Sequence, residues 1–125
     1  MYVYAFEKLE VWQLARRFTA EIYRLTRCFP EEERFGLTSQ MRRSARSVAA
    51  NIAEGSTRAT GKDQGHFYNT SFGSAIEVLN DLIIACDLEF ISPEQLLSYR
   101  ARLEIITFKI NSLRNAVYPN AHKRP

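Results

Sequence analysis

The sequence predicts an all-α protein, an antiparallel up-down-up-down four-helix bundle. Apolar residues recur every three or four positions in four separate segments, which is the spacing of a helix with one buried face. Prolines and capping residues separate these segments, and no stretch alternates as a half-buried strand does. Because the connections are short, consecutive helices are expected to run in opposite directions.

The first two helices are expected within residues 11–29 and 37–52. Pro30 is expected to end the first, because the residue before a proline avoids helical backbone. Gly55 stands where a C-terminal cap of the second helix is expected. The predicted buried faces are Val11, Ala15, Phe18, Ile22, Leu25 and Phe29 in the first helix and Leu37, Met41, Ala45, Val48 and Ile52 in the second.

Capping signals mark the start of the last two helices. Thr60 and Asp63 have the spacing of a capping box. Ser92 and Gln95 form a clearer one, with Pro93 at the first helical position. The predicted buried faces are Tyr68, Phe72, Ala75, Leu79, Leu82 and Cys86 in the third helix and Leu96, Tyr99, Leu103, Ile106, Ile110, Leu113 and Val117 in the fourth.

Length and composition indicate one globular domain. The chain has 125 residues, 46% of them hydrophobic, which is enough for a core of its own. Pro119 is expected to end the fourth helix, so residues 1–118 form the domain and residues 119–125 a flexible tail. No apolar run approaches the ~20 residues of a membrane span. Cys28 and Cys86 are expected to be buried thiols in a reducing cytoplasm.

A second apolar line on the fourth helix predicts self-association. At ~100° per residue, four apolar residues fall on one side of this helix, away from its predicted buried face. An exposed patch of that kind is typical of an interface, although it could instead widen an irregular core. Two aromatic residues share a similar flank on the first helix. The predicted oligomer interface is Leu97, Ala101, Ile105, Phe108, Trp12 and Tyr23.

Arginine supplies most of the positive charge. The chain has 13 arginines, four lysines and a formal net charge of +3. The planar guanidinium suits phosphate, and a helix N-terminus favours an anion, so we expect contacts with RNA or DNA. The alternatives are a solvated charged face, or ion pairs with Glu54, Glu77 or a neighbouring subunit. The predicted nucleic-acid-binding residues are Arg42, Arg43, Arg46, Arg58 and Lys62.

No combination of residues points to catalysis or to a metal. Residues 55–63 superficially resemble a phosphate-binding loop, but five residues separate Gly55 from Gly61 instead of four. Asp63 also replaces the hydroxyl that binds magnesium in such loops. The Glu-x-x-His pairs of a di-metal bundle are missing from the sequence. We therefore expect no enzymatic activity, no metal and no cofactor.

Several segments together resemble a known family. Similarity to the four-helix proteins encoded in 23S ribosomal RNA intervening sequences extends over residues 6–13, 29–33, 36–43, 51–55, 73–77 and 85–88. By position, Arg42 and Arg43 match the family's paired arginines, and Asn51, Glu54 and Gly55 match its Asn-Ile-Ala-Glu-Gly motif.

The resemblance implies a ring-forming bundle, most simply a homopentamer. It extends distantly to the accessory variability proteins of diversity-generating retroelements, which contact a reverse transcriptase and nucleic acid. One departure is Glu89-Phe90, where the family often has glycine. This difference affects the turn into the fourth helix.

Two functional hypotheses follow. The first is a non-enzymatic cytoplasmic ring that binds RNA or DNA through its arginines, mainly at phosphates and without sequence specificity. No platform of aromatic and basic residues for base stacking is predicted. The alternative is a scaffold or adaptor whose arginines stabilise the oligomer and whose partner is another protein.

Overall fold

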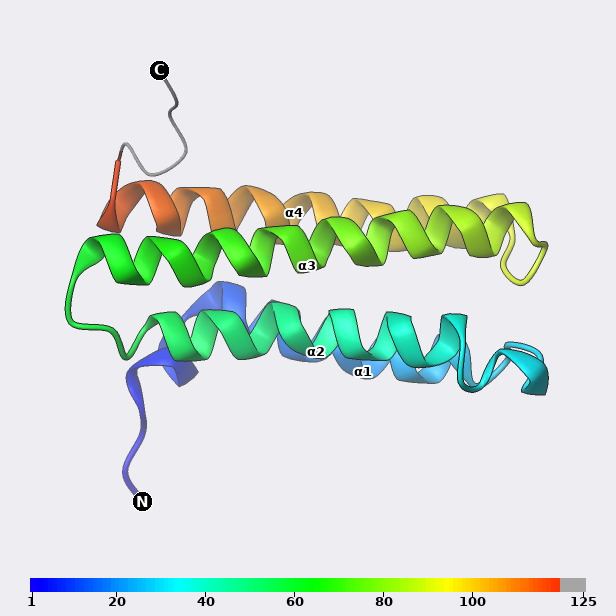
Figure 1. The fold of residues 1–125 in the computed structure, drawn as a ribbon, viewed down its shortest axis with the longest axis horizontal. Helices are drawn as coiled ribbons and strands as arrows, with labels where there is room; N and C mark the ends of the chain where they lie inside the picture. Colours follow the sequence, from blue (N-terminus) through cyan, green and yellow to red (C-terminus); the bar gives the residue numbers. More distant parts are fainter. Residues whose placement is uncertain (120–125) are drawn as a thin grey trace.

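Four long helices make up most of the computed structural model, which describes residues 1–119 (Figure 1). Within these residues no strand occurs, so the predicted all-α class is confirmed. The predicted flexible tail lies, from residue 120 onward, outside the described part of the chain. The elements are η1 (Ala5–Lys8), α1 (Glu10–Thr26), η2 (Glu31–Glu33), α2 (Leu37–Gly55), α3 (Gly61–Asp87) and α4 (Pro93–Val117), of which η1 and η2 are short 3-10 turns.

Hydrogen bonds between helices define their relative directions. The Ser44 hydroxyl donates to Glu77 Oε2 at 3.0 Å, and the Ser71 hydroxyl donates to the Val48 carbonyl at 2.7 Å. Residue numbers therefore rise along α2 as they fall along α3, so the two helices are antiparallel. Figure 1 shows the chain reversing at each loop, with α1 beside α2 and α3 beside α4.

Two ion pairs join α1 to α4. Glu21 Oε2 lies 2.8 Å from Arg102 Nη1, and Glu10 Oε1 lies 2.7 Å from Lys109 Nζ. Their order along the two helices is again opposite. These contacts close the bundle between its first and last helices.

The buried faces of the first two helices follow the predicted spacing. All six predicted residues of the first face are buried, and so are Met41, Ala45, Val48 and Ile52 of α2. Leu37 is half-buried. On α4 the centre of the predicted face, Leu103, Ile106 and Ile110, is buried, while its ends are half-buried.

The predicted face of α3 is confirmed only in part: Tyr68, Ala75 and Leu82 are buried, but the other half of the face is not. Val78 and Ala85 are completely buried, whereas Phe72, Leu79 and Cys86 are only half-buried. The difference arises because α3 packs against both α2 and α4, and the side facing α2 buries small serines. Ser71 is fully buried and hydrogen-bonded to α2, so a polar residue occupies part of the core face.

The predicted helix starts agree with the structure, with one qualification. Ser92 Oγ accepts from the Gln95 N–H at 3.1 Å, and Gln95 Oε1 accepts from the Ser92 N–H at 2.9 Å, which completes a capping box. Thr60 Oγ1 accepts from the Asp63 N–H at 3.1 Å. The reciprocal bond from Asp63 is missing at this end of α3, so only half of the second predicted box is present.

Three local predictions about the ends of α1 and α2 are wrong. α1 ends at Thr26, and Phe29 reaches the core from the following turn. Cys28 in that turn is exposed, because only its neighbour Phe29 faces inward. Gly55 is the last residue of α2 and does not adopt positive φ; Ser56 is the C-cap. Gly55 instead allows close packing, as a Cβ there would lie 2.7 Å from Tyr68 Cε1.

Candidate nucleic-acid interface

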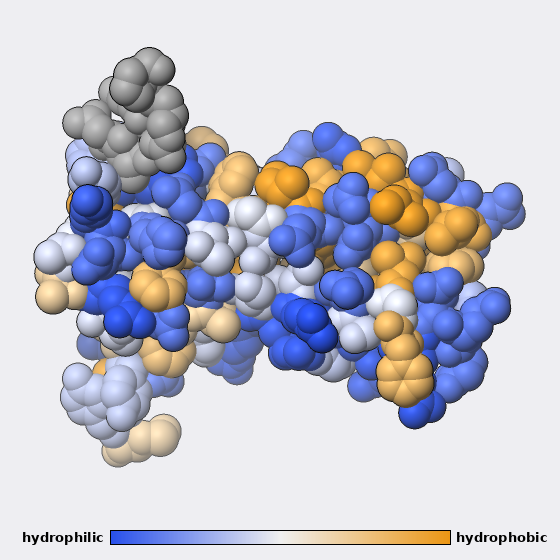
Figure 2. Space-filling model, in the orientation of Figure 1, coloured by the Kyte–Doolittle hydropathy of each residue, from blue (hydrophilic) through white to orange (hydrophobic). Residues whose placement is uncertain are grey.

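Exposed arginines of the helices lie mainly on α1 and α2, whereas exposed large apolar side chains of the helices lie on α3 and α4. α1 and α2 carry no exposed large hydrophobic side chain, but they carry five exposed arginines. In contrast, α3 and α4 carry six of the exposed large hydrophobic residues, and Figure 2 shows the larger apolar patches over these helices. The exposed arginines of α1 and α2 are Arg16, Arg17, Arg24, Arg43 and Arg46, and Arg27, the C-cap residue of α1, is exposed as well.

Arg42 differs from its neighbours because its guanidinium is bound within the chain. Its Nε donates to Thr26 Oγ1 at 2.8 Å, and its Nη2 donates to the Tyr23 carbonyl at 3.2 Å. The guanidinium carbon also lies 4.6 Å from the centre of the Tyr23 ring. The half-buried Arg42 therefore attaches α2 to the end of α1, and this attachment uses two of its five guanidinium N–H donors.

The other two predicted arginines of α2 face outward. Arg43 is exposed and takes part in none of the ion pairs within residues 1–119. Arg46 is exposed, and its Nη1 donates to the Tyr23 hydroxyl. Tyr23 thus contacts two arginines of its own chain, one through its ring face and carbonyl and the other through its hydroxyl.

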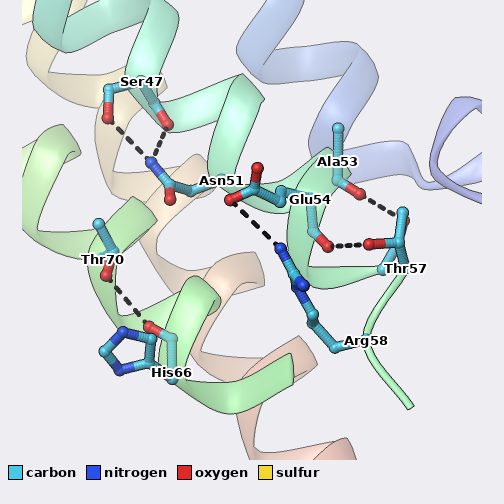
Figure 3. Close-up of polar contacts among 9 residues, drawn as sticks. Ser47, Asn51, Ala53, Glu54, Thr57, Arg58, His66 and Thr70 are labelled. Atoms are coloured by element: carbon cyan, nitrogen blue, oxygen red, sulfur yellow. Dashed lines mark hydrogen bonds and ion pairs between the residues drawn. The ribbon is translucent and has the colours of Figure 1, made fainter. Parts of the chain in front are cut away.

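Arg58 follows the C-terminal end of α2 and Lys62 lies in α3, whereas Arg42, Arg43 and Arg46 lie between the start and the middle of α2. Arg58 forms an ion pair with Glu54 (Figure 3), with 3.7 Å between Nη2 and Oε2. The Arg58 guanidinium carbon lies 4.6 Å from the centre of the Phe67 ring. Lys62 is exposed in the first turn of α3. The structure therefore does not bring these two residues together with Arg42, Arg43 and Arg46 as one compact group.

The predicted carboxylate partners of the α2 arginines have other partners. Glu54 pairs with Arg58, and Glu77 accepts a hydrogen bond from Ser44. The expectation that these carboxylates neutralise Arg42, Arg43 or Arg46 is wrong for the described part of the chain. Asn51 of the same motif bonds within its own helix, since its Nδ2 donates to the carbonyl and hydroxyl of Ser47, both at 2.9 Å (Figure 3).

The second apolar line on α4 is exposed, as the spacing predicted. Leu97, Ile105 and Phe108 are 67%, 53% and 73% exposed, and Ala101 between them is also exposed. Trp12 and Tyr23 are only half-buried, and each already contacts an arginine of its own chain. The four residues of α4 are named here the α4 stripe.

The structure also forms an aromatic group that the sequence analysis did not identify. Tyr2, Tyr4, Phe6 and Trp12 follow one another with ring centres 4.9, 6.4 and 4.9 Å apart. The Arg16 guanidinium carbon lies 5.4 Å from the centre of the Trp12 ring. The alternation of Tyr2 and Tyr4 was the available signal, because side chains two residues apart share one side of an extended segment, whereas Phe6 already lies in η1.

Residues 7–112 match the family described as 23S rRNA-intervening sequence protein. The chain belongs to this family. A crystal structure from Bacteroides thetaiotaomicron, of a protein with unknown function from the S23 ribosomal protein family, has the same fold with a TM-score of 0.74. The two chains are 24% identical over 83% of this chain and 97% of the other. No curated protein matches the sequence.

Across residues 1–119, no three His, Cys, Asp or Glu side chains are close enough together to hold a metal ion. None of the described helices combines the length and apolarity needed to cross a membrane.

One buried cation of α4 was not predicted. Arg114 is 8% exposed, and its Nη1 donates to Asn69 Oδ1 of α3. Burial lowers the pKa of the Arg114 guanidinium. Its place in the last turn of α4 puts positive charge at the negative end of the helix dipole, which is a favourable location.

Proposed function

We propose that this protein is a non-enzymatic, self-associating nucleic-acid-binding protein. It binds the phosphates of RNA or DNA through exposed arginines of α1 and α2, without sequence preference, and it associates through the α4 stripe. The separation of exposed arginines from exposed apolar residues carries this proposal. One side of the bundle can then bury apolar surface while the other remains available to a polyanion.

The carboxylates of residues 10–55 neutralise little of the positive charge that the arginines of α1 and α2 expose. Residues 10–55 contain eight arginines, no lysine and six carboxylates. Three of the carboxylates lie in η2, and Glu10 and Glu54 lie at helix ends. Glu21, near the middle of α1, is paired with Arg102 of α4. The central surface of both helices therefore exposes cations, which attract phosphates through sequence-independent electrostatics.

The occupant proposed for the α4 stripe is a second copy of this chain. Its centre is apolar, and Arg100 and Glu104 beside it form an exposed pair with 3.8 Å between Nε and Oε2. An apolar centre with a charged rim is the usual anatomy of a protein interface. The resemblance to ring-forming relatives favours a closed ring, most simply a homopentamer, in which the arginine side stays exposed.

The nucleic-acid part is tested by fluorescence anisotropy with labelled single- and double-stranded RNA and DNA from about 50 to about 200 mM salt. We expect binding that weakens steeply with salt. Arg24→Ala/Arg43→Ala should weaken it by about tenfold or more and flatten the salt dependence. The matched control Arg100→Ala/Lys109→Ala also removes two charges, but from α4, and should retain binding.

Two results would overturn this part of the proposal. One is no binding of any nucleic acid by the wild-type protein at the lowest salt. The other is equal loss of affinity in the test and control variants. A stable oligomer without nucleic-acid binding would instead indicate the scaffold or adaptor hypothesis.

Self-association is tested by light scattering behind a sizing column at micromolar concentration. Ile105→Glu introduces a charge into the α4 stripe and should lower the measured mass, because a buried unpaired carboxylate is costly. Gln40→Glu adds the same charge at an exposed position of α2 and should leave the mass unchanged. A wild-type mass of 14.5 kDa, that of one chain, would contradict the proposal.

A further inference from the structure

We propose that Tyr2, Tyr4, Phe6 and Trp12, named here the aromatic series, bind the bases of single-stranded nucleic acid by stacking. This inference rests on the proposed function and adds that the preferred nucleic acid is single-stranded. It differs from phosphate binding because a duplex hides the faces of its bases, whereas a single strand exposes them.

The four rings form a row whose outer end, at Tyr2 and Tyr4, is exposed to solvent. Tyr2 and Tyr4 are 75% and 60% exposed, so both rings are accessible. Phe6 and Trp12 are half-buried and pack edge to face at 4.9 Å, which fixes the inner end of the row on the bundle. Aromatic rings of this kind supply sequence-tolerant stacking, because every base has a π face.

Hydrogen bonds fix Tyr4 and the η1 turn that carries Phe6, the middle of the row, before any ligand arrives. The Tyr4 N–H donates to Glu7 Oε1 at 2.9 Å, and the Glu7 N–H donates to the Tyr4 carbonyl at 3.1 Å. Gln13 Nε2 of α1 donates to the Glu7 carbonyl at 2.8 Å, which attaches η1 to α1. A row held this way loses less conformational freedom on binding than a loose segment would.

The aromatic series also leads directly into the arginine side of α1. Arg16 lies over the ring of Trp12, at the inner end of the row. From there a shallow depression along α1 is lined by Arg16, Arg17, Ala20, Glu21 and Arg24. A strand whose bases stack on the rings could therefore continue with its phosphates along these arginines. Rings next to a positively charged groove are the usual combination in single-strand-binding proteins.

Trp12 provides a built-in probe, because it is the only tryptophan in the chain. We would titrate the protein with single-stranded RNA and DNA of about 12 nucleotides, within the usual range of binding-site sizes, and with duplexes of the same sequence. Quenching of Trp12 fluorescence and tighter binding of the single strands are expected. Tyr2→Ala/Tyr4→Ala should weaken single-strand binding by about tenfold or more, given typical stacking contributions, and leave duplex binding unchanged.

Two further variants test whether weaker single-strand binding results from the loss of these particular rings. Tyr2→Phe/Tyr4→Phe keeps the rings and should retain single-strand binding. Phe35→Ala removes another exposed aromatic residue, one that lies 4.8 Å from the Arg34 guanidinium carbon at the turn between α1 and α2. Because Phe35 is outside the series, this variant should bind single strands as the wild type does.

The outcomes distinguish this inference from the proposed function. If neither single strands nor duplexes bind, the proposed function fails, and this inference fails with it. If both forms bind equally well and Tyr2→Ala/Tyr4→Ala changes neither affinity, the aromatic series is not a base-binding site, while phosphate binding stands. A lower oligomer mass for Tyr2→Ala/Tyr4→Ala, with unchanged binding per chain, would instead assign the series to a contact between subunits.

Discussion

Arg42 Nε donates a 2.8 Å hydrogen bond to Thr26 Oγ1, and this contact joins α2 to the last turn of α1. The Thr26 hydroxyl in turn donates to the Ile22 carbonyl at 2.8 Å, so the guanidinium completes a short chain of hydrogen bonds. Arg43, the next residue, is exposed. Two adjacent arginines of the same motif thus occupy different environments, one between helices and one at the surface.

Replacing Arg42 should therefore affect stability, whereas replacing Arg43 should not. We expect Arg42→Ala to lower the free energy of unfolding by about 2 kcal/mol, because it removes two charged hydrogen bonds and a contact with the Tyr23 ring. Arg43→Ala should stay within about 0.5 kcal/mol of wild type. Urea denaturation at one fixed protein concentration measures both. Equal midpoints for the two variants would contradict this assignment.

Replacing Glu89 with glycine should stabilise the folded protein. It has φ of 65°, and α3 ends with bonds from the Glu89 N–H to the Cys86 carbonyl and from the Phe90 N–H to the Ala85 carbonyl. This arrangement is the Schellman motif, in which the left-handed residue is usually glycine. Glu89→Gly should raise the free energy of unfolding by about 0.5–1 kcal/mol, less than the full left-handed penalty because glycine also gains unfolded-state entropy.

A matched substitution checks the cause of that effect. Glu104→Gly changes the same residue type in the middle of α4, where the backbone is helical. It should lower the free energy of unfolding by about 1 kcal/mol, the usual cost of glycine inside a helix. Thermal denaturation followed by circular dichroism compares the two variants. Destabilisation by both would show that the left-handed backbone at Glu89 carries no penalty.

The sequence was sufficient to predict those parts of the fold that depend on local pattern. The spacing of apolar residues identified the buried face of α1 completely, and Ser92 with Gln95 identified the start of α4. The spacing of apolar residues was less informative for α3, because a polar residue such as Ser71 is expected at the surface but is buried in this helix. Whether a serine faces solvent or a neighbouring helix depends on which helices pack together, and spacing within one helix does not contain that information.

The candidate site depended more on tertiary structure. The outward positions of Arg43 and Arg46 and the exposure of the α4 stripe followed from helical periodicity. The binding of Arg42 by Thr26 did not, because the two residues meet only when α1 and α2 pack. The aromatic series was missed for the same reason, since Trp12 joins the preceding aromatic residues only after η1 folds back onto α1.

Gly55 and Gly73 should respond oppositely to alanine. A Cβ at Gly55 would lie 2.7 Å from Tyr68 Cε1 and 2.9 Å from Phe67 Cβ, so Gly55→Ala should lower the free energy of unfolding by about 1–2 kcal/mol. At exposed Gly73 on α3, nothing lies within 4 Å of the added atom. Gly73→Ala should therefore raise the free energy of unfolding by about 0.5–1 kcal/mol, because alanine has a higher helix propensity than glycine. Stabilisation by both substitutions would contradict the close approach of α2 and α3 at Gly55.

Asp81 of α3 should make stability depend on pH. Desolvation by burial, with a smaller effect from the charge of Glu77, raises the pKa of the Asp81 carboxyl, although a hydrogen bond from Asn80 opposes the shift. Because the pKa is higher in the folded state, protonated Asp81 favours folding at acidic pH, below the unfolded pKa of about 3.9. That stabilisation is lost as the pH rises through the folded pKa, and at pH 7 the ionised carboxylate is unfavourable.

Asp81→Asn should therefore be more stable than wild type at pH 7, and the difference should shrink as the pH falls below the carboxyl pKa. Urea denaturation of both proteins from neutral to acidic pH measures this trend. Glu104→Gln is a suitable control, because Glu104 is exposed and its 3.8 Å contact with Arg100 is a surface ion pair of little energetic value. It should change stability little at either pH. A difference between Asp81→Asn and wild type that stays constant with pH would show that ionisation of Asp81 does not oppose folding.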